Sequence, residues 1–225
     1  MIGFKGSHFE KEIFLWGVRW YVAYPISYRQ LEEIMGERGV IVDHSTLNRW
    51  VIKYAPEIEK QFRRQQRPVG RRWRMDETYV RVKGEWKYLY RAVDHEGQTS
   101  DFLLTPHRDK AAAAAFWHRA IRSQGLPEKI TIGQSGSNTA AIRHYNRTHK
   151  TAIVIRQSKY LNNVVEQDHR AVKRITPPML GFKSFWAVCC TRAGIEVMHA
   201  IRKGQLRISG DPPQTPAEQF YELAA

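Results

Sequence analysis

Residues 74–105 read RMDETYVRVKGEWKYLYRAVDHEGQTSDFLLT, and this stretch decides the fold class. Apolar and polar side chains alternate over most of it, which is typical of half-buried β-strands. Turn residues interrupt the alternation at Lys83-Gly84 and again at 94–97. The stretch therefore predicts a three-stranded antiparallel meander, with strands at 74–82, 86–93 and 99–105.

The chain downstream of the meander alternates between helical and strand patterns. The expected elements are an alanine-rich helix at 109–122, a short buried strand at 129–132, a polar helix through Tyr145, a strand at 152–155, a basic helix at 164–175 and an apolar helix from Phe185 to about Ile201. This order predicts an α/β domain in which helices flank a mixed sheet.

The first 59 residues predict a separate, all-helical module. Helical periodicity runs through 9–21, 28–37 and 46–54, and Pro56 is expected to stop the third helix. The last two helices and their tight turn form a helix-turn-helix pattern, which places short polar and basic side chains where they reach base edges and phosphates. The candidate DNA-binding residues here are Ser45, Thr46, Asn48, Arg49 and Lys53. An ordinary helical hairpin with a polar outer face is the alternative.

The composition narrows the class of partner. Lys and Arg number 36 against 22 Asp and Glu, which gives a net charge of +14, and 42% hydrophobic residues suffice for a packed core. A surplus of positive charge this large favours nucleic acid as the partner. The 2 cysteines, Cys189 and Cys190, are adjacent and exclude a disulfide framework. With no apolar run of bilayer length and no convincing signal peptide, we expect a cytoplasmic protein without a membrane partner.

Residues 60–74, KQFRRQQRPVGRRWR, contain seven basic residues and no acid. They predict a basic linker whose Arg71 and Arg72 can follow a phosphate backbone, a reading compatible with a simple solvated arm. The proline-rich segment at 205–225 predicts a peripheral tail. The expected organisation is thus a helix-turn-helix module at 1–59, the linker at 60–74, an α/β domain at 75–204 and the tail.

Two carboxylates stand out because acids are scarce in this chain. Asp76 falls in the middle of the first predicted strand, and Glu166 lies on the basic helix with Arg170 and Lys173. A carboxylate on a central strand is costly to desolvate unless a cation compensates it. That cation is either one of the many arginines in a salt bridge or a divalent metal of the kind that assists phosphodiester chemistry.

Other candidates give weaker signals. The nine histidines show no zinc-like spacing with cysteine. Ser135-Gly136-Ser137 follows a predicted strand and is compatible with an anion-binding turn, but it lacks the spacing of a phosphate-binding loop.

Several longer stretches resemble a known family. RWRMDETYV, KYLYRAVD, KYLNNVVEQDHRAVKR and MLGFKSF, together with VDHSTLNRWV in the helix-turn-helix, look like the transposases of the insertion-sequence-six family, the replicative, cointegrate-forming insertion sequences. The family belongs to the DDE superfamily, so the resemblance implies an RNase H-like fold, with the catalytic domain at 75–204. It also implies a DNA transposase that acts on terminal inverted repeats and on target DNA, as a dimer or larger assembly associated with the bacterial nucleoid.

The resemblance also assigns roles to individual residues. It makes Asp76 the first catalytic acid and Glu166 the last, both as ligands in a site for two Mg²⁺ ions. Lys173 matches the family's basic residue on the glutamate's helix and would face DNA. Tyr160, Asn162 and Asn163 match the loop that leads into this helix. In an intact family member, water activated by one ion nicks the transposon end, and the freed 3′ hydroxyl attacks target DNA.

The second catalytic acid is missing. The family has an aspartate immediately after the fourth strand, where this sequence has Gly133, and residues 129–150 contain no acid that could replace it. Asp168 lies two positions beyond Glu166 and points elsewhere on the helix. We therefore predict a transposase fold and DNA-binding surface with impaired chemistry. Decay of the element and a deliberate substitution that traps a DNA complex are both compatible with the glycine. The alternative function is a catalytically inactive DNA-binding protein derived from a transposase; a related nuclease acting on RNA finds no support in the motifs.

Overall fold

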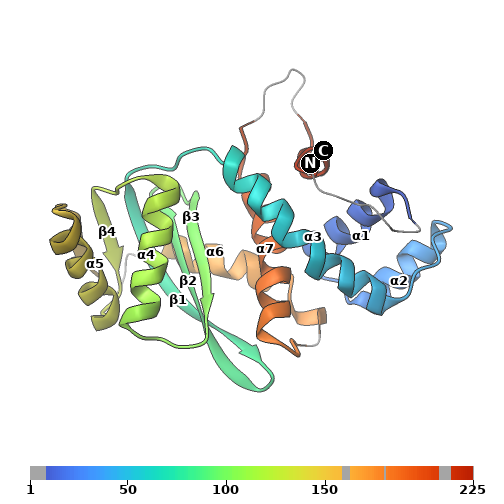
Figure 1. The fold of residues 1–225 in the computed structure, drawn as a ribbon, viewed down its shortest axis with the longest axis horizontal. Coiled ribbons are helices and arrows are strands. Elements are labelled where there is room, and N and C mark those ends of the chain that lie inside the picture. The colour runs from blue at the N-terminus through green and yellow to red at the C-terminus, as the bar shows by residue number, and fades with distance from the viewer. Residues whose placement is uncertain (1–8, 159–162, 180, 208–213, 225) are drawn as a thin grey trace. The chain divides into compact units, whose positions relative to one another are not determined.

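The computed structural model describes residues 9–158, 163–179, 181–207 and 214–224 (Figure 1). The chain divides into two compact units, a helical unit formed by 1–67 with 171–225 and an α/β unit formed by 68–170. Over the described residues, every helix is too short or too polar to cross a lipid bilayer.

The described elements follow one another along the chain as helices, a meander, and alternating helices and strands. They are α1 (Lys11–Ala23), α2 (Tyr28–Glu37), α3 (His44–Gln65), β1 (Arg72–Val82), β2 (Glu85–Asp94), β3 (Thr99–Thr105), α4 (Lys110–Gln124), β4 (Lys129–Ile132), α5 (Gly136–His149), β5 (Val154–Gln157), α6 (Asn163–Lys173), the short 3-10 helix η1 (Pro177–Met179), α7 (Phe185–Arg202) and α8 (Pro216–Glu222).

The α/β unit contains one five-stranded sheet in the order β3-β2-β1-β4-β5. β1, β2 and β3 are antiparallel neighbours, whereas β4 is parallel to β1 and β5 is parallel to β4. Trp73 and Met75 of β1 pack in the same core as Phe116 and Trp117 of α4, which lies across the sheet in Figure 1. The meander, the mixed sheet and the flanking helices confirm the predicted RNase H-like fold class, and they place the strand with Asp76 at the centre.

The last strand begins two residues later than the sequence pattern predicts. The side chain of Asn146 explains this difference, because its Oδ1 accepts hydrogen bonds from the Thr151 hydroxyl at 2.8 Å and from the Ile153 N–H at 3.1 Å. These bonds hold residues 151–153 in the connection after α5. Pairing with β4 therefore starts only at Val154.

The helical unit is built on α3, whose buried stripe packs against α1 and α7. The prediction that this helix ends at Pro56 is wrong. Ile58 and Phe62 continue the apolar stripe beyond the proline and are both buried, so packing sustains the helix to Gln65. The segment between α3 and β1 is accordingly shorter than the predicted linker at 60–74, because 60–65 are helical and 72–74 belong to β1.

Helix α7 groups with the helical unit, although the sequence pattern placed it in the domain at 75–204. Its apolar residues meet α3 and α1, and close packing requires Gly194, where a Cβ atom would come within 2.6 Å of a Val22 methyl carbon. The bulk of the buried α7 surface therefore belongs to the core of the helical unit.

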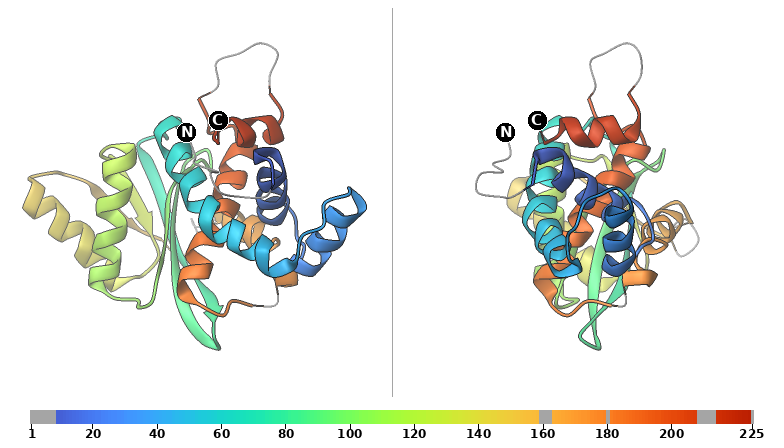
Figure 2. Two further views of the ribbon diagram at one scale, coloured as in Figure 1. Left: turned by 45° about the vertical axis from the view of Figure 1, so that its right-hand side comes forward. Right: turned by 90° about the vertical axis from the view of Figure 1, so that its right-hand side faces the viewer.

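The described part of the C-terminal segment is not peripheral, so that prediction is wrong. Phe220, Leu223 and Ala224 share one face at helical spacing and are buried in the core of the helical unit. Leu206 is also buried and pairs with Gln66 in an isolated β-bridge. Figure 2 shows α8 beside α7 and α1. This short helix therefore covers one side of the core of the helical unit.

Candidate functional site

The carboxylate site is organised by the register of two parallel strands. Met75 of β1 pairs with Ile132, the last residue of β4, so Asp76 and Gly133 each follow a member of this pair along the chain. If positions 76 and 133 are the first two acid positions of the family, as predicted, they have to lie side by side in this way.

Glu166 approaches the same site from α6. Burial raises the pKa of the Asp76 carboxyl above its ordinary value, against a backbone hydrogen bond from the Glu77 N–H that lowers it. The negative charges of Glu166 and Glu77 raise this pKa further. The Glu166 carboxylate is therefore near enough to Asp76 for the two like charges to interact.

Gly133 contributes no side-chain ligand to this site. Its carbonyl oxygen accepts a hydrogen bond from the Ser135 N–H at 2.8 Å as the chain turns into α5. Within the residues that the structure describes, no group of three or more His, Cys, Asp or Glu side chains could hold a metal ion. Two converging carboxylates suit a divalent cation, but the donor set is short of what two ions need.

A buried ion pair fixes α6 beside the sheet. Arg91 of β2 is fully buried and binds the carboxylate of Asp168, which is 7% exposed. Val165, His169 and Val172 complete the buried stripe of α6, whereas Glu166, Arg170 and Lys173 are exposed, as the two predicted faces of this helix require. Asp168 thus serves the packing of α6, and Glu166 is left beside that stripe.

Glu77 is a buried acid whose surroundings the sequence analysis missed. Its side chain is 7% exposed and binds Arg108, while the Asn138 amide and the Ser135 hydroxyl donate hydrogen bonds to its Oε1. Strand alternation places Glu77 on the same face as Trp73 and Met75, and an acid on an apolar face was the available signal. The turn at Ser135-Gly136-Ser137, whose sequence is compatible with anion binding, therefore contacts the Glu77 carboxylate of the same chain.

The helix-turn-helix module presents its candidate residues at the start of α3. Asp43 caps this helix by accepting from the N–H groups of Ser45 and Thr46, and hydrogen bonds to their side chains hold the pKa of Asp43 well below its ordinary range. Arg49 donates to the Thr46 hydroxyl at 2.6 Å. Thr46, Arg49 and the exposed Lys53 follow one helical line, whereas Ser45 and Asn48 follow the next.

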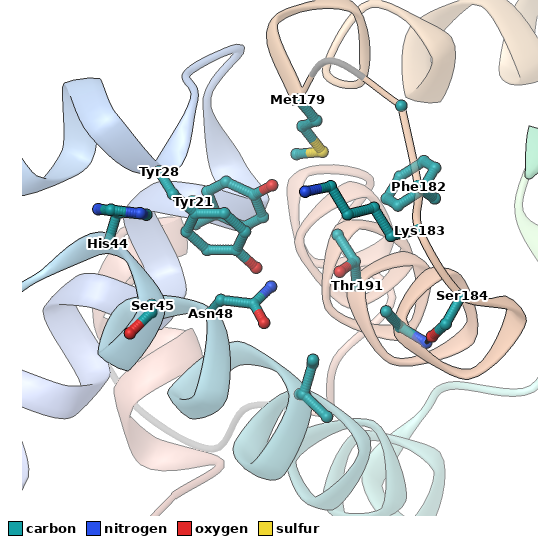
Figure 3. A pocket seen from close by; sticks show the side chains of 13 residues that line it. Tyr21, Tyr28, His44, Ser45, Asn48, Met179, Phe182, Lys183, Ser184 and Thr191 are labelled. Atoms are coloured by element: carbon teal, nitrogen blue, oxygen red, sulfur yellow. Dashed lines mark hydrogen bonds between the residues drawn. The ribbon is translucent and has the colours of Figure 1, made fainter. Parts of the chain in front are cut away.

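A cavity of about 430 Å³ lies beside Ser45 and Asn48 in the helical unit (Figure 3). Tyr21 and Tyr28 stack at 3.7 Å between ring centroids on one side, and Lys183 and Ser184 face them from the start of α7. Burial raises the pKa of the Tyr28 hydroxyl to about 12, so this group is a neutral hydrogen-bond partner near pH 7. The cavity gives this side of α3 an aromatic wall and a cation.

The other predicted DNA-binding residues lie at separate places. Arg170 and Lys173 are exposed on α6, and Arg72 is exposed at the first position of β1. Arg71 is also exposed and forms an ion pair with Glu128 at 3.4 Å. Asn163 is exposed at the start of α6, whereas Tyr160 and Asn162 lie outside the described residues.

A half-buried acid on a central strand, with a second acid on a flanking helix, is what the resemblance to DDE enzymes implies, and the comparisons with known proteins support the family. A family model for the DDE domain, of the IS240 transposase type, matches residues 70–205. The transposase of the insertion sequence-like element IS431mec from Staphylococcus aureus is 39% identical over 206 residues, which cover 91% of this chain and 90% of that protein. The chain therefore belongs to the DDE-domain family of insertion-sequence transposases, whose chemistry in general is nucleotidyl transfer.

Two solved structures of viral integrases are also similar. The catalytic core domain of BIV integrase is 18% identical, with a TM-score of 0.46 over 68% of this chain and 95% of that chain. A chain of the simian T-cell lymphotropic virus intasome, solved with the PP2A regulatory subunit B56 gamma, is 15% identical, with a TM-score of 0.49 over 68% of this chain and 59% of that chain.

Proposed function

We propose that this chain binds the terminal inverted repeats of an insertion sequence, and that its DNA nicking and strand transfer are impaired by Gly133. One observation carries the proposal. Asp76 and Gly133 follow paired residues on parallel strands, and Glu166 lies close enough to raise the pKa of Asp76. Two of the three acid positions that the resemblance implies would therefore carry carboxylates, and the third would carry a glycine.

The DNA-binding part of the proposal rests on polar and basic side chains, all of which are exposed except the partly buried Thr46 and Asn48. Thr46, Arg49 and Lys53, with Ser45 and Asn48 beside them, would read the inverted repeat from the start of α3. Arg71 just before β1, Arg72 at its start, and Arg170 and Lys173 on α6 would bind phosphates. Each of these nine side chains carries a positive charge or a hydrogen-bond donor.

The metal requirement follows from the same donor set. Asp76 and Glu166 would be the ligands of Mg²⁺, which prefers carboxylate oxygens. With no side chain at Gly133, these residues do not fit the two-ion site that the family implies, so we expect weak Mg²⁺ binding and derive no reaction step through the metal.

The alternative function is a DNA-binding protein without catalytic activity, which would compete with an active transposase for the same DNA ends. Gly133 is the observation that favours it. The two functions differ only in whether the chain retains some DNA nicking and strand transfer, since both need the same DNA-binding surface.

A binding assay run beside a nicking assay tests the proposal. The chain should retain an inverted-repeat duplex on a filter more tightly than a scrambled duplex, and Arg49→Ala should weaken this retention. Arg147→Ala removes an equally exposed positive charge from α5 and serves as the control. Binding with weak nicking supports the proposal, binding with no nicking supports the alternative, and absence of DNA binding contradicts both.

Assembly and location complete the proposal. Two DNA ends and a target must be joined in one reaction, so we expect a homodimer or a larger assembly on DNA. The staphylococcal source of the similar transposase supports a place on the nucleoid of a bacterial cell.

A further inference from the structure

The hairpin between β1 and β2 extends past the rest of the sheet. β4 pairs with β1 only as far as Met75, and β3 pairs with β2 only from Tyr88 onward. β1 and β2, by contrast, stay paired with each other to Val82 and Glu85. The segment from Tyr79 to Tyr88 is here called the tip ribbon, and among the described residues only Tyr88 at its end pairs with a third strand (Figure 1).

One face of the tip ribbon carries aromatic rings and an arginine. Tyr79 is directly opposite Tyr88, and Arg81 is directly opposite Trp86, so all four side chains share a face. Tyr79 contacts Trp86 and Tyr88 at centroid distances of 6.0 and 5.4 Å, and the Arg81 guanidinium lies 5.9 Å from the Trp86 ring. Tyr79 is nevertheless 50% exposed and Trp86 58% exposed, which is unusual for large rings that have no ligand to bind.

The tip ribbon is also positively charged. Arg81, Lys83 and Lys87 are opposed by one acid, Glu85, which is paired with Lys87 at 2.8 Å. Lys83 and Gly84 form a two-residue turn in which both φ angles are positive, at 50° and 83°. Such turns favour Asn or Gly at the first position, so the lysine puts a charge at the tip at a conformational cost.

We propose that the tip ribbon is a second DNA-contacting surface, which binds duplex DNA without reading its sequence. The cations suit the phosphates of DNA, the rings add apolar contact area beside them, and a two-stranded ribbon is narrow enough for the major groove. The same ribbon of a second copy fits poorly here, because it would bring the cations of Arg81, Lys83 and Lys87 against themselves. Strand alternation turns Asp76 to the opposite face of β1, so the ribbon contacts DNA away from the reacting bond. The choice of DNA rests on the proposed function.

The chain offers a matched pair of lysines to test this surface. Lys83→Asn removes the charge at the tip, while asparagine suits the left-handed turn and keeps the hairpin folded. Lys150 is the other described non-glycine residue with a positive φ, at 52°, so Lys150→Asn removes the same charge from the same backbone conformation just after α5. Affinity for a short random-sequence duplex, measured by fluorescence anisotropy over a range of salt concentrations, should fall about fivefold with Lys83→Asn. The slope of log affinity against log salt should fall by about 0.9. Lys150→Asn should change neither quantity.

A second pair of variants tests the rings. Trp86→Ala should weaken binding by about fivefold or more, whereas Trp186→Ala, which removes a tryptophan that is 66% exposed on α7, should leave the affinity unchanged. A photo-reactive benzoylphenylalanine at position 86 should cross-link to DNA. Normal affinity in both Lys83→Asn and Trp86→Ala, or cross-links to a second protein chain instead of DNA, would overturn the tip-ribbon proposal alone. A native chain that binds no DNA would overturn the proposed function as well.

Discussion

Arg91 and Asp168 form an ion pair that joins β2 to α6 in the interior of the α/β unit. Arg91 is also the residue directly opposite Asp76 in the antiparallel pairing of β1 and β2. Asp168 follows Glu166 by two residues on α6. This buried ion pair therefore connects α6, which carries Glu166, to the position on β2 that lies opposite Asp76.

Removing the cation from this pair should be strongly destabilising. Arg91→Met leaves the Asp168 carboxylate buried without its guanidinium, at a cost of about 3–5 kcal/mol in the free energy of unfolding. Denaturant titration measures the loss. Arg71→Ala is the control, since the Arg71–Glu128 pair is well exposed and its removal should cost less than about 1 kcal/mol.

The double variant shows whether the loss comes from the unpaired charge. Arg91→Met combined with Asp168→Leu replaces both charges by apolar groups and should recover much of the stability. Equal losses for Arg91→Met and Arg71→Ala would mean that the buried pair does not anchor α6.

The ionised carboxylate of Asp76 should lower the free energy of unfolding near neutral pH. Burial comes first among the causes that raise the pKa of Asp76, followed after an opposing backbone hydrogen bond by the charge of Glu166. The pKa of Asp76 in the folded chain lies above the unfolded value of about 3.9. Stability is therefore lost as the pH rises from the unfolded pKa through the folded pKa and Asp76 ionises. Asp76→Asn should therefore raise the melting temperature at pH 7, and the gain should vanish below about pH 4. A gain that is the same at both pH values would show that the charge is not its source.

The C-terminal helix should be essential to the helical unit. Phe220 is fully buried, so Phe220→Ala should cost about 3–5 kcal/mol through lost burial and a new cavity. Glu222→Ala changes an exposed residue of the same helix and should be nearly neutral. Thermal and denaturant unfolding of the two variants measures the difference, and similar stabilities would contradict the placement of α8 in the core.

Local patterns in the sequence predicted most of the α/β unit. Alternation and turn residues placed β1, β2 and β3 to within two residues, and Lys129–Ile132 was predicted with its observed bounds. These patterns succeed because each strand buries one face and each turn requires particular backbone angles. The two faces of α6 were predicted in the same way, from helical spacing alone.

The errors came from interactions between residues far apart in the chain. Pro56 is a helix breaker locally, but burial of Ile58 and Phe62 keeps α3 intact beyond it. Phe220 gave no signal in a proline-rich tail, because its burial depends on partners about 200 residues earlier in α1 and on α7. For the site, spacing and resemblance predicted Asp76, Gly133 and Glu166 as the three acid positions, but the partners of Glu77 and Asp168 required the tertiary structure.

The most direct test of the account is strand transfer in Mg²⁺ by the native chain and by Gly133→Asp. Gly133→Asn, which is similar in size but is a much poorer Mg²⁺ ligand, is the control. We expect Gly133→Asp to raise nicking and strand transfer by roughly a hundredfold or more, because it supplies the missing carboxylate of a metal site that contributes several kcal/mol. All three proteins should bind an inverted-repeat duplex equally well. A native chain that is already as active as Gly133→Asp would contradict the central claim.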